Sequence, residues 1–479
     1  MENTVKKHRK PNLIVSLIAV VVLILFLAIN IFKFKGLLLG TYSNHYILFI
    51  AAAVAFGIGL VHKVPTRDVF YEVFQNLKSV AAPVFILILV GALTGTWLVS
   101  GVIPAMLYYG LQLVNPTIFL PTCVLVSAIV SIATGSSWTT SATVGIAFVG
   151  IGTALGFESG MIAGAVISGA YFGDKMSPLS DTTNLAPAMA GTDLFTHIRY
   201  MSLTTIPTFL LTLIFFTILS FFHSTTGVVD VTILLKDIVA TFQISPLLFL
   251  VPGLVVGLML LKTKPLLALS SGVGFALLFA VFFQGELLSK LPFPTSEVLT
   301  KAVFSNLEIP TKSETLNSLF RSDGVLGMVW TILLILAAMV FGGVMDAIGA
   351  LSRITESLLH IAHTTFGLFA STVFSCLGLN IVASDQYLAI VVPGKMFKKA
   401  YEDKGLAPEN LSRTLEDSGT VTSVLVPWNT CGAYQSKVLL GEVGDLSFIP
   451  YAFFNYLSPF TTLIFAAFKI KIQQQANKN

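Results

Sequence analysis

Residues 173–184 read Gly-Asp-Lys-Met-Ser-Pro-Leu-Ser-Asp-Thr-Thr-Asn and interrupt an otherwise apolar stretch. A second run of the same kind, residues 416–431, reads Glu-Asp-Ser-Gly-Thr-Val-Thr-Ser-Val-Leu-Val-Pro-Trp-Asn-Thr-Cys. Each run contains one proline, Pro178 or Pro427, and a proline inside a helix removes an amide donor and frees a carbonyl one turn earlier. We therefore expect two broken helices, each with carboxylates, hydroxyls and free backbone oxygens at the break.

The composition of the chain indicates that these breaks lie in a membrane. Charged residues make up 11% of the 479 residues and hydrophobic residues 55%, whereas a soluble globular protein is roughly 25% charged. The mean hydropathy is +0.85. So few charges cannot cover a soluble surface, and we predict an all-α polytopic membrane protein. The net charge of +4 comes from basic residues spread over short loops, which argues against a nucleic-acid-binding patch.

Apolar segments long enough to cross a bilayer recur along the whole chain, since a crossing helix needs about 20 residues. The predicted spans are residues 13–32, 45–61, 80–99, 117–134, 139–155, 159–190 (interrupted), 204–223, 245–261, 265–284, 324–345, 364–383, 385–397 (short), 411–441 (interrupted) and 448–468. Two further segments, 102–114 and 347–362, are predicted to lie along the membrane interface. Residues 285–323 are polar with alternating charge signs, and we interpret them as a solvated connector.

The two halves of the chain repeat at an interval of 248 residues. At this interval Gly95 corresponds to Gly343, Ser136 to Ser384, Thr182 to Thr430, and Asp181 to Asn429. Each half contains five spans and one pair of segments, which is either a re-entrant hairpin or two crossings. Each half therefore makes an odd number of net crossings, and the second half is inserted upside down. Inverted repeats with interrupted helices are a recurring plan of secondary transporters.

These considerations divide the chain into segments and give it an orientation. Most of the 28 lysine and arginine residues fall on the side of the N-terminus if that terminus is inside, as expected for cytoplasmic loops. The predicted segments are a cytoplasmic N-terminal segment (1–11), the first inverted repeat (12–223), a connector (224–244), the second inverted repeat (245–470) with 285–323 as an extracellular insertion, and a cytoplasmic tail (471–479).

The residues at the two breaks are those expected of a cation site. Carboxylates, hydroxyls and freed carbonyls provide only oxygen ligands, which suits a hard cation such as Na⁺. The tips of the paired segments, 134–141 and 382–386, add further oxygens, and Gly135 permits a sharp turn. The candidate ion-binding or substrate-binding residues are Asp181, Asp174, Asp385, Asp417, Ser136, Ser137, Trp138, Ser177, Thr182, Asn184, Ser384, Asn429 and Thr430. For Na⁺ itself we predict Asp181, Thr182, Asn429 and Ser137 as ligands.

Several of these residues have a structural alternative. Carboxylates inside a membrane are costly and usually functional, but Asp181 can also serve as a partner for the helix break. Asp174 can form an ion pair with the adjacent Lys175, and Asp417 lies close in sequence to Glu416 and Arg413. Trp138 is either a wall of the substrate pocket or an interfacial aromatic residue.

The predicted mechanism follows from desolvation. A carboxyl group in a dry cavity holds its proton more tightly, whereas a bound cation favours the ionised form. Na⁺ and H⁺ then compete for one site, and a protein that changes sides only when the site is occupied exchanges the two ions. Two halves related by inversion supply access from the two sides of the membrane.

At these residues the chain resembles the NhaC family of sodium/proton antiporters, within the wider ion-transporter superfamily. The similarity rests on Gly173–Pro187, Ala133–Trp138, Asp385–Leu388 and Val426–Cys431, and the order of segments agrees across the chain. The family commonly reads Thr-Ser-Trp-Gly-Thr at the first tip, whereas here Ser137 precedes Trp138 and Thr139 follows it. The resemblance implies Na⁺/H⁺ exchange in a bacterial plasma membrane, a scaffold with a mobile transport unit, and the homodimer common in the superfamily.

Two other function classes compete with a cation/proton antiporter. The first is an antiporter for an organic acid (of the malate/lactate type) or an amino acid, coupled to Na⁺ or H⁺. Lys175 and Lys437 are the residues that favour it, since an anion site needs positive groups. The second is an intramembrane enzyme or ATP-driven pump, which the sequence disfavours because it has neither a phosphate-binding Gly-rich loop nor a His-Glu-x-x-His pair. We therefore expect a transporter that is not an enzyme, with Na⁺ and H⁺ as cargo and no resident cofactor.

Overall fold

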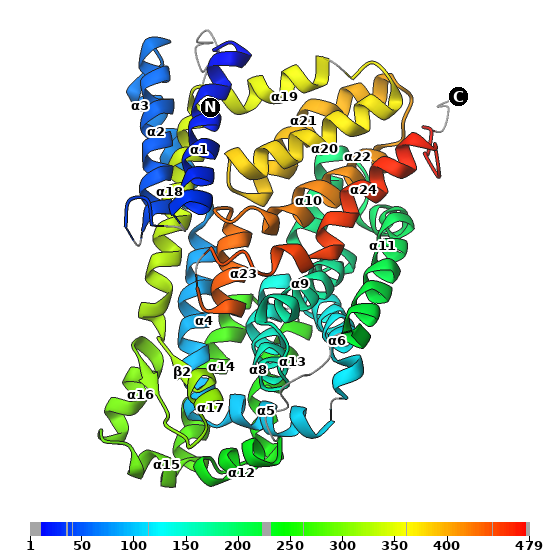
Figure 1. The fold of residues 1–479 in the computed structure, drawn as a ribbon. Coiled ribbons are helices and arrows are strands. Elements are labelled where there is room, and N and C mark those ends of the chain that lie inside the picture. The colour runs from blue at the N-terminus through cyan, green and yellow to red at the C-terminus, as the bar shows by residue number, and fades with distance from the viewer. Residues whose placement is uncertain are drawn as a thin grey trace.

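The computed structural model describes residues 11–34, 37–40, 42–113, 115–222, 231–261, 263–360, 362–442 and 444–475. The predicted segments 1–11, 224–244 and 471–479 lie wholly or partly outside these residues. Helices make up most of the described chain (Figure 1). Those in the first half are α1 (Leu13–Phe34), α2 (Ser43–Val61), α3 (Thr66–Ser79), α4 (Ala81–Val99), α5 (Val102–Leu113), η1 (Pro116–Ile118), α6 (Phe119–Thr134), α7 (Ser137–Thr140), the π-helical turn η2 (Ser141–Gly145), α8 (Ile146–Ala154), α9 (Ser159–Met176), α10 (Asp181–Ala190) and α11 (Leu194–Phe222).

The second half contains a similar succession and one small hairpin. Its elements are α12 (Val231–Thr241), η3 (Pro246–Phe249), α13 (Leu250–Leu260), α14 (Pro265–Phe283), α15 (Gly285–Lys290), α16 (Thr295–Phe304), β1 (Leu307–Glu308), α17 (Glu314–Leu319), β2 (Arg321–Ser322), η4 (Val325–Met328), α18 (Val329–Ala347), α19 (Ala350–His360), α20 (Thr365–Val382), α21 (Gln386–Asp403), α22 (Pro408–Leu415), the π-helical turn η5 (Glu416–Thr420), η6 (Ser423–Leu425), α23 (Thr430–Leu440), η7 (Ile449–Tyr451) and α24 (Phe453–Ala467).

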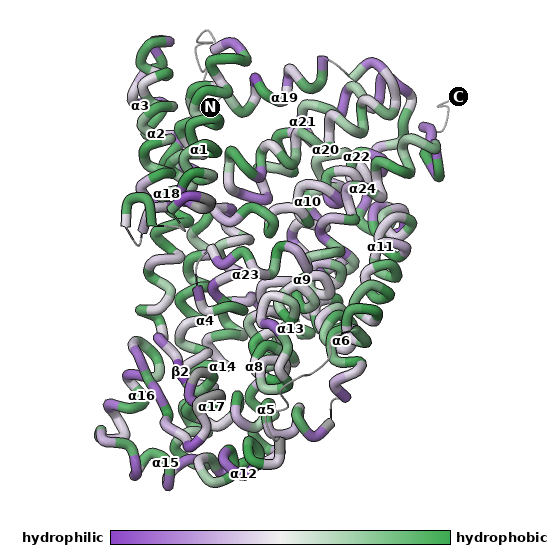
Figure 2. Tube along the Cα trace, in the orientation of Figure 1, coloured by the Kyte–Doolittle hydropathy of each residue, from purple (hydrophilic) through white to green (hydrophobic). Residues whose placement is uncertain are grey.

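The prediction of a helical polytopic membrane protein is confirmed. Within the described residues, eight helices are long and apolar enough to cross a bilayer, and a ninth span results if the bent α12–α13 pair is one crossing. The eight are α1, α2, α4, η1 with α6, α11, α14, η4 with α18, and α20. Several present large exposed side chains such as Phe222 and Phe282, which a hydrocarbon environment accommodates. Apolar residues dominate the trace, and hydrophilic residues concentrate at its ends and near the breaks (Figure 2).

The helix boundaries recur at the interval of 248 residues found in the sequence. At this interval α4 (81–99) falls on α18 (329–347), and α5 falls on α19. The helix pair α6 and α9–α10 falls on α20 and α22–α23. In Figure 1, α5 lies at the lower end of the molecule and α19 at the upper end. Corresponding elements of the two halves therefore occupy different places in the bundle.

The polar stretch 285–323 differs from the solvated connector that we expected. It forms α15, α16, α17 and the antiparallel pair of β1 with β2, and it packs against α4 through buried residues such as Val298 and Ala302. A Cβ added at Gly95 of α4 would lie 1.9 Å from the Ala302 carbonyl oxygen. The alternation of charges concealed these apolar contacts, because one apolar residue in three or four suffices to dock a short helix.

The sequence analysis also missed one helix and ended another too early. Residues 66–79, assigned to a loop, form the amphipathic helix α3, and the segment predicted as 385–397 continues as α21 to Asp403. In both cases polar residues at helical spacing were taken for the end of a helix. A helix that is only partly buried needs just one apolar stripe.

Small residues bring α6 and α9 together and thereby position the first break. A Cβ at Gly169 would lie 2.2 Å from the Val124 carbonyl oxygen, and one at Gly173 would lie 2.3 Å from that of Ala128. Ser131 of α6 donates a hydrogen bond to the Ala170 carbonyl oxygen at 2.6 Å. The end of α9, with Asp174, is thus held directly against the end of α6 and the tip that follows it.

Candidate functional site

The first break lies between α9 and α10, where the sequence predicted it. Helix α9 ends at Met176, and Ser180 begins α10 as its N-cap by accepting a hydrogen bond from the Thr183 amide. The Thr183 hydroxyl donates to the carbonyl oxygens of Asp174 and Lys175, each at 3.2 Å. Hydroxyl groups therefore satisfy the backbone oxygens that the break frees, as membrane depth requires.

Two of the predicted site residues donate side-chain hydrogen bonds to backbone carbonyl oxygens at or beside this break. Ser177 donates from its hydroxyl to the Ile132 carbonyl oxygen at 2.7 Å. The side-chain amide of Asn184 donates to the carbonyl oxygens of Pro178 and Ser180, at 3.0 and 2.6 Å. Both residues are thus occupied in holding the shape of the break.

The first tip meets the break through Gly135 and Ser137. Gly135 has a left-handed φ of +69°, and a Cβ at this position would lie 2.6 Å from Leu179 Cβ. The residue is glycine because both the turn and the close approach exclude a side chain. The amide and hydroxyl of Ser137 donate to Asp174 Oδ2 at 3.1 and 2.7 Å. The other oxygen of Asp174, Oδ1, is buried without a hydrogen-bond partner among the described residues.

The second break lies between η6 and α23 and meets the second tip in the same way. Asn429 caps α23 by accepting from the Cys431 amide, and its own amide donates to the backbone and side-chain oxygens of Asn380. The Thr430 amide donates to the Ser384 carbonyl oxygen at 3.0 Å. Ser384 has a left-handed φ of +59°, and Asp385 caps α21 by accepting from the Leu388 amide at 3.0 Å. Asn380, which the sequence analysis passed over inside an apolar span, is the residue that joins this tip to the break.

A cavity of about 510 Å³ lies between the two breaks. It is lined by five of the predicted residues together with others from α4, the α13–α14 loop and the start of α21. The predicted residues among them are Ser136, Trp138, Asp174, Asp181 and Thr430. Asp181 Oδ2 accepts a hydrogen bond from the Tyr387 hydroxyl, which also lines the cavity. Two carboxylates from one break and a hydroxyl from the other thus face a common space, called the site cavity below.

The two carboxylates of the site cavity differ in burial. Asp174 is 8% exposed, whereas Asp181 is exposed. The sequence analysis predicted Asp181 as a Na⁺ ligand and named Asp174 only among the candidate site residues. Asp174 has the drier surroundings because it lies within α9, a helix packed on several sides, while Asp181 begins the short helix α10.

The remaining predicted residues lie around the site cavity rather than on its wall. Thr182 donates to Glu416 Oε1 at 3.1 Å and so links the first break to η5. Asp417 forms a fully buried ion pair with Lys175 and accepts a hydrogen bond from the Thr204 hydroxyl at 2.9 Å. The hydroxyl of Thr462 also donates to Asp417. Neither carboxylate oxygen of Asp417 is therefore free.

The alternative in which Lys175 neutralises Asp174 is wrong, because Lys175 is paired with Asp417. Consecutive residues of a helix point about 100° apart, so Asp174 faces the tip while Lys175 faces η5 and α24. Arg413, the other candidate partner of Asp417, packs its guanidinium over the Tyr200 ring, 4.5 Å from the centroid. The partner of Lys175 lies 242 residues away in sequence, beyond the reach of any local pattern.

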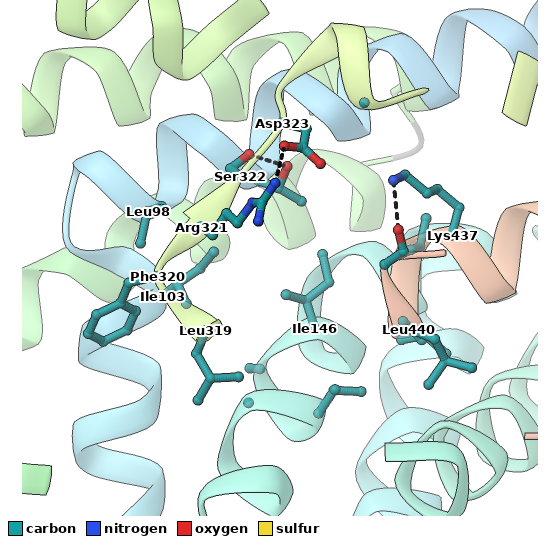
Figure 3. Close-up of a pocket in the computed structure, with 18 of the residues that line it drawn as sticks. Leu98, Ile103, Ile146, Leu319, Phe320, Arg321, Ser322, Asp323, Lys437 and Leu440 are labelled. Carbon is teal, nitrogen blue, oxygen red and sulfur yellow. Dashed lines mark hydrogen bonds and ion pairs between the residues drawn. The ribbon is translucent and has the colours of Figure 1, made fainter. Parts of the chain in front are cut away.

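A second cavity, of about 370 Å³, lies at the C-terminal end of α23 (Figure 3). Its walls come from α4, α5, α8, the β2 strand and the end of α23. Arg321 and Asp323 pair at 3.8 Å on one wall, and Lys437 on another donates to the Gly441 carbonyl oxygen at 2.7 Å. None of the predicted site residues lines this space, which we call the outer cavity.

A membrane-spanning helical bundle with two helix breaks around one cavity, and with carboxylates of the first break on the cavity wall, defines a membrane transport protein. A model of the Na⁺/H⁺ antiporter family matches residues 169–470. The chain belongs to this family. Over 437 residues it is 38% identical to the Na⁺/H⁺ antiporter NhaC of Alkalihalophilus pseudofirmus, and the match covers 91% of this chain and 93% of that protein. The resemblance to the NhaC family found in the sequence is thereby confirmed.

Two further relatives have other cargoes in their names. The chain is 31% identical to the arginine/ornithine antiporter ArcD of Halobacterium salinarum, over 95% of this chain and 92% of that protein. It is 32% identical to the malate-2H⁺/Na⁺-lactate antiporter of Bacillus subtilis, over 86% of each protein. All three relatives are antiporters, and the family is one of transporters.

Proposed function

We propose that the protein exchanges Na⁺ for H⁺ across the bacterial plasma membrane and that both ions bind in the site cavity. The observation that carries this proposal is the pair Asp174 and Asp181, which line one cavity beside the second break. The proposal is supported by membership of the Na⁺/H⁺ antiporter family. Na⁺ prefers oxygen ligands, and the cavity wall offers carboxylate and hydroxyl oxygens.

Asp174 and Asp181 are the groups for which the two ions compete. Asp174 Oδ1 and the Thr134 hydroxyl are buried without partners in the described part of the chain, and both residues line the cavity. A Na⁺ ion placed there gains two negative charges, whereas a proton removes one of them. Binding of one ion therefore weakens binding of the other, which is the coupling that exchange requires.

The sequence-based Na⁺ ligands divide into two roles under this proposal. Asp181 contacts the ion, and Ser137 aims Asp174 at it through two hydrogen bonds. Thr182 and Asn429 stabilise the two breaks through Glu416 and Asn380. Ser136 and Thr430 line the cavity and supply neutral oxygens.

Asp417, Asp385, Ser384, Ser177 and Asn184 act as positioning residues in this account. Asp417 and Lys175 neutralise each other, and hydroxyls of α11 and α24 occupy the remaining carboxylate positions. Asp385 and Ser384 hold the second tip against α21 and α23. These contacts fix the distance between the breaks and so the size of the site cavity.

The two halves, residues 12–223 and 245–470, are proposed to be inverted repeats that give access from alternate sides. Support comes from the recurrence of helix boundaries at 248 residues and from the location of α5 and α19 at opposite ends of the bundle. The distribution of lysine and arginine supports cytoplasmic termini and an extracellular insertion at 285–323. A homodimer remains a prediction of the family resemblance.

An organic acid or amino acid is the second candidate cargo. The site cavity, at about 510 Å³, is far larger than a bare cation needs, and Trp138, Tyr387 and Lys264 line it. Aromatic walls with one ammonium group suit a small carboxylate. Two relatives of this chain are named for arginine/ornithine exchange and for malate and lactate exchange.

Purified protein in liposomes with an imposed pH gradient separates these functions. If the protein is a Na⁺/H⁺ antiporter, Na⁺ alone dissipates the gradient, and K⁺ or choline at equal ionic strength serves as the control. If dissipation requires malate, lactate or an amino acid in addition, the second candidate replaces the first. Empty liposomes give the leak rate to be subtracted.

A further inference from the structure

The site cavity and the outer cavity lie at opposite ends of one interface, between α23 and the segment α7–η2–α8. Trp138 and Thr430 line the site cavity, while Ile146 and the residues 438–441 line the outer cavity. From Thr430 to Gly441, helix α23 advances roughly 16 Å at 1.5 Å per residue. A closed layer of side chains separates the two spaces over this length.

An aromatic pair begins the layer on the side of the site cavity. The rings of Trp138 and Tyr434 stack with centroids 4.0 Å apart and an interplanar angle of 20°. The Tyr434 hydroxyl donates to the Trp138 carbonyl oxygen at 2.9 Å. Because Trp138 also lines the site cavity, this stack borders that cavity.

Polar side chains without partners occupy the middle of the layer. Both amide atoms of Gln435 and the hydroxyl of Ser141 are buried with no hydrogen-bond partner among the residues that the structure describes. Gly145 faces Leu439, since a Cβ there would lie 2.9 Å from Leu439 Cδ2. Gln435 precedes Leu439 by four residues and Ser141 precedes Gly145 by four, so each pair shares a helix face. Gln435 and Ser141 therefore lie on the two sides of this interface, each one turn before the Gly145–Leu439 contact.

A buried amide and a buried hydroxyl without partners are unfavourable in a closed protein, and two apolar residues would pack better. Because they lie between two cavities, they can contact a cation that passes when the layer opens. Amide and hydroxyl oxygens can replace part of a cation's hydration shell. The π-helical turn η2 at residues 141–145 is a local irregularity of the kind often found at functional sites.

We infer that the interface between α23 and η2 is the ion's route to the second side of the membrane, with the Trp138–Tyr434 stack as its gate and Gln435 with Ser141 as a neutral cation-binding step within it. This inference rests on the proposed ion exchange and extends it to the path that the ion takes. Separation of the stacked rings joins the site cavity to the outer cavity. The outer cavity, walled in part by residues 319–323 of the insertion, is then the vestibule on that side.

Labelling of single cysteines with a membrane-impermeant quaternary-ammonium thiosulfonate tests the route in proteoliposomes. The test variants are Gln435→Cys and Ser141→Cys, and the native cysteines, all buried, provide the blank. Gly150→Cys marks the outer cavity, because a Cβ at Gly150 meets no atom within 4 Å. Thr263→Cys marks the site cavity. These two controls define the sides independently of any assumption about topology.

The reagent is added on the side from which Gly150→Cys is labelled. We expect the labelling rate of Gln435→Cys to differ by about fivefold or more between Na⁺-saturated and Na⁺-free conditions. A modest shift in the populations of two conformations would produce a change of this size. Adding Tyr434→Phe, which removes the hydrogen bond to Trp138 and keeps the ring, should accelerate labelling. If neither test position is labelled under any ion condition, or if Na⁺ leaves both rates unchanged, the route is wrong.

This measurement does not depend on the exchange assay. If labelling depends on Na⁺ but the protein shows no Na⁺/H⁺ exchange, the result supports the proposed gate and contradicts the proposed cargo. Normal exchange with unreactive cysteines at positions 141 and 435 retains the cargo and rejects the gate. Should Gln435→Cys fail to fold, Ser141→Cys reports on the same interface from the facing helix.

Discussion

Asp174 and Asp181 line the same cavity but already have different partners. Asp174 is held by the amide and hydroxyl of Ser137 and has one free oxygen, whereas Asp181 accepts the hydroxyl of Tyr387. A carboxylate that keeps a free oxygen in a buried place is ready to bind a cation or a proton. Asp174 is thus the deeper of the two proposed ion-binding groups, and Asp181 is the more accessible one.

Replacing either carboxylate by its amide should abolish exchange without unfolding the protein. We expect Asp174→Asn and Asp181→Asn each to lower the rate of Na⁺-dependent proton movement by about 100-fold or more, equivalent to roughly 2.7 kcal/mol. The reason is that an amide neither binds a proton near neutral pH nor supplies the negative charge that balances Na⁺. The matched control is Asp193→Asn, at an exposed residue outside the site cavity whose carboxylate accepts a hydrogen bond from the Thr196 amide. Near-normal exchange by Asp181→Asn would remove that residue from its role.

The buried pair of Lys175 and Asp417 should contribute to stability rather than to ion binding. Asp417→Leu leaves an unpaired buried ammonium group and should lower the free energy of unfolding by about 3–5 kcal/mol. The double variant Lys175→Met with Asp417→Leu removes both charges and should recover most of this loss. Thermal unfolding in detergent measures the effect. If the double variant is stable but cannot exchange Na⁺, Asp417 is an ion-binding residue after all.

The sequence identified site residues that carry a local signal, but it did not predict contacts between residues far apart in the chain. Pro178 and Pro427 mark the two breaks locally, and Asp174 and Asp181 are conspicuous as carboxylates within apolar helices. Their polar contacts are not local. Tyr387 reaches Asp181 across 206 residues, and Gln435 has no feature that distinguishes it from an ordinary helix residue. The roles of Tyr387 and Gln435 depend on which helices pack together. No short pattern in a single sequence predicts that packing.

At the level of elements, the tips and breaks depend on a few positions where the backbone needs glycine. Gly135 is the clearest, since it combines a left-handed φ with contact against Leu179. In the second tip the left-handed residue is Ser384, which corresponds to Ser136 at the interval of 248 residues and adopts this region without being glycine. Both tips therefore contain a residue with a left-handed φ, but that residue is glycine in the first tip and serine in the second.

Gly135→Ala should loosen the first tip and weaken Na⁺ binding. The added methyl group must occupy space 2.6 Å from Leu179 Cβ and adopt a strained φ, at a cost of about 1–3 kcal/mol. Gly150→Ala is the matched control, because its methyl group meets nothing within 4 Å and a helical glycine gains up to about 1 kcal/mol on such a change. Thermal unfolding and the Na⁺ concentration for half-maximal exchange are the readouts. Equal behaviour of the two variants would show that the tip tolerates displacement.

Element boundaries were predicted best where apolar runs end abruptly and worst where polar residues continue a helix. The apolar runs at α1, α4 and α14 ended within a few residues of the predicted positions. Helix α3 and the docked insertion were missed because their buried stripes are narrow and their exposed faces are charged. Burial of one stripe is decided by the neighbouring element, and the sequence of the segment itself reveals only its polarity.

The whole molecule combines a membrane-spanning bundle with one structured polar insertion. Composition alone was enough to predict the membrane class, because so few charged residues cannot cover a soluble protein. The recurrence of helix boundaries in the two halves was predictable from the interval of 248 residues. The docking of 285–323 against α4 gives the bundle an end that differs from the end carrying α19 (Figure 1).

The proposed topology predicts that the insertion faces the outside of the cell. A cysteine at Ser296, an exposed position of α16, should react with an impermeant thiol reagent in intact cells. A cysteine at His363, exposed after α19, should react only after the membrane is opened. The expectation follows from the excess of lysine and arginine on the side of residues 346–413. The opposite pattern of reactivity would reverse the orientation and leave the repeat itself intact.

Competition between Na⁺ and H⁺ for Asp174 and Asp181 is the central claim for the whole protein, and its most direct test is the apparent half-saturating Na⁺ concentration of exchange measured as a function of pH. In proteoliposomes, with pH equal on both sides and Na⁺ uptake followed with a radioactive tracer, a lower pH should raise this concentration by up to about tenfold per unit, because each proton bound displaces one cation. The maximal rate at saturating Na⁺ should stay nearly constant. A half-saturating concentration that does not vary with pH while the maximal rate falls would contradict a shared site.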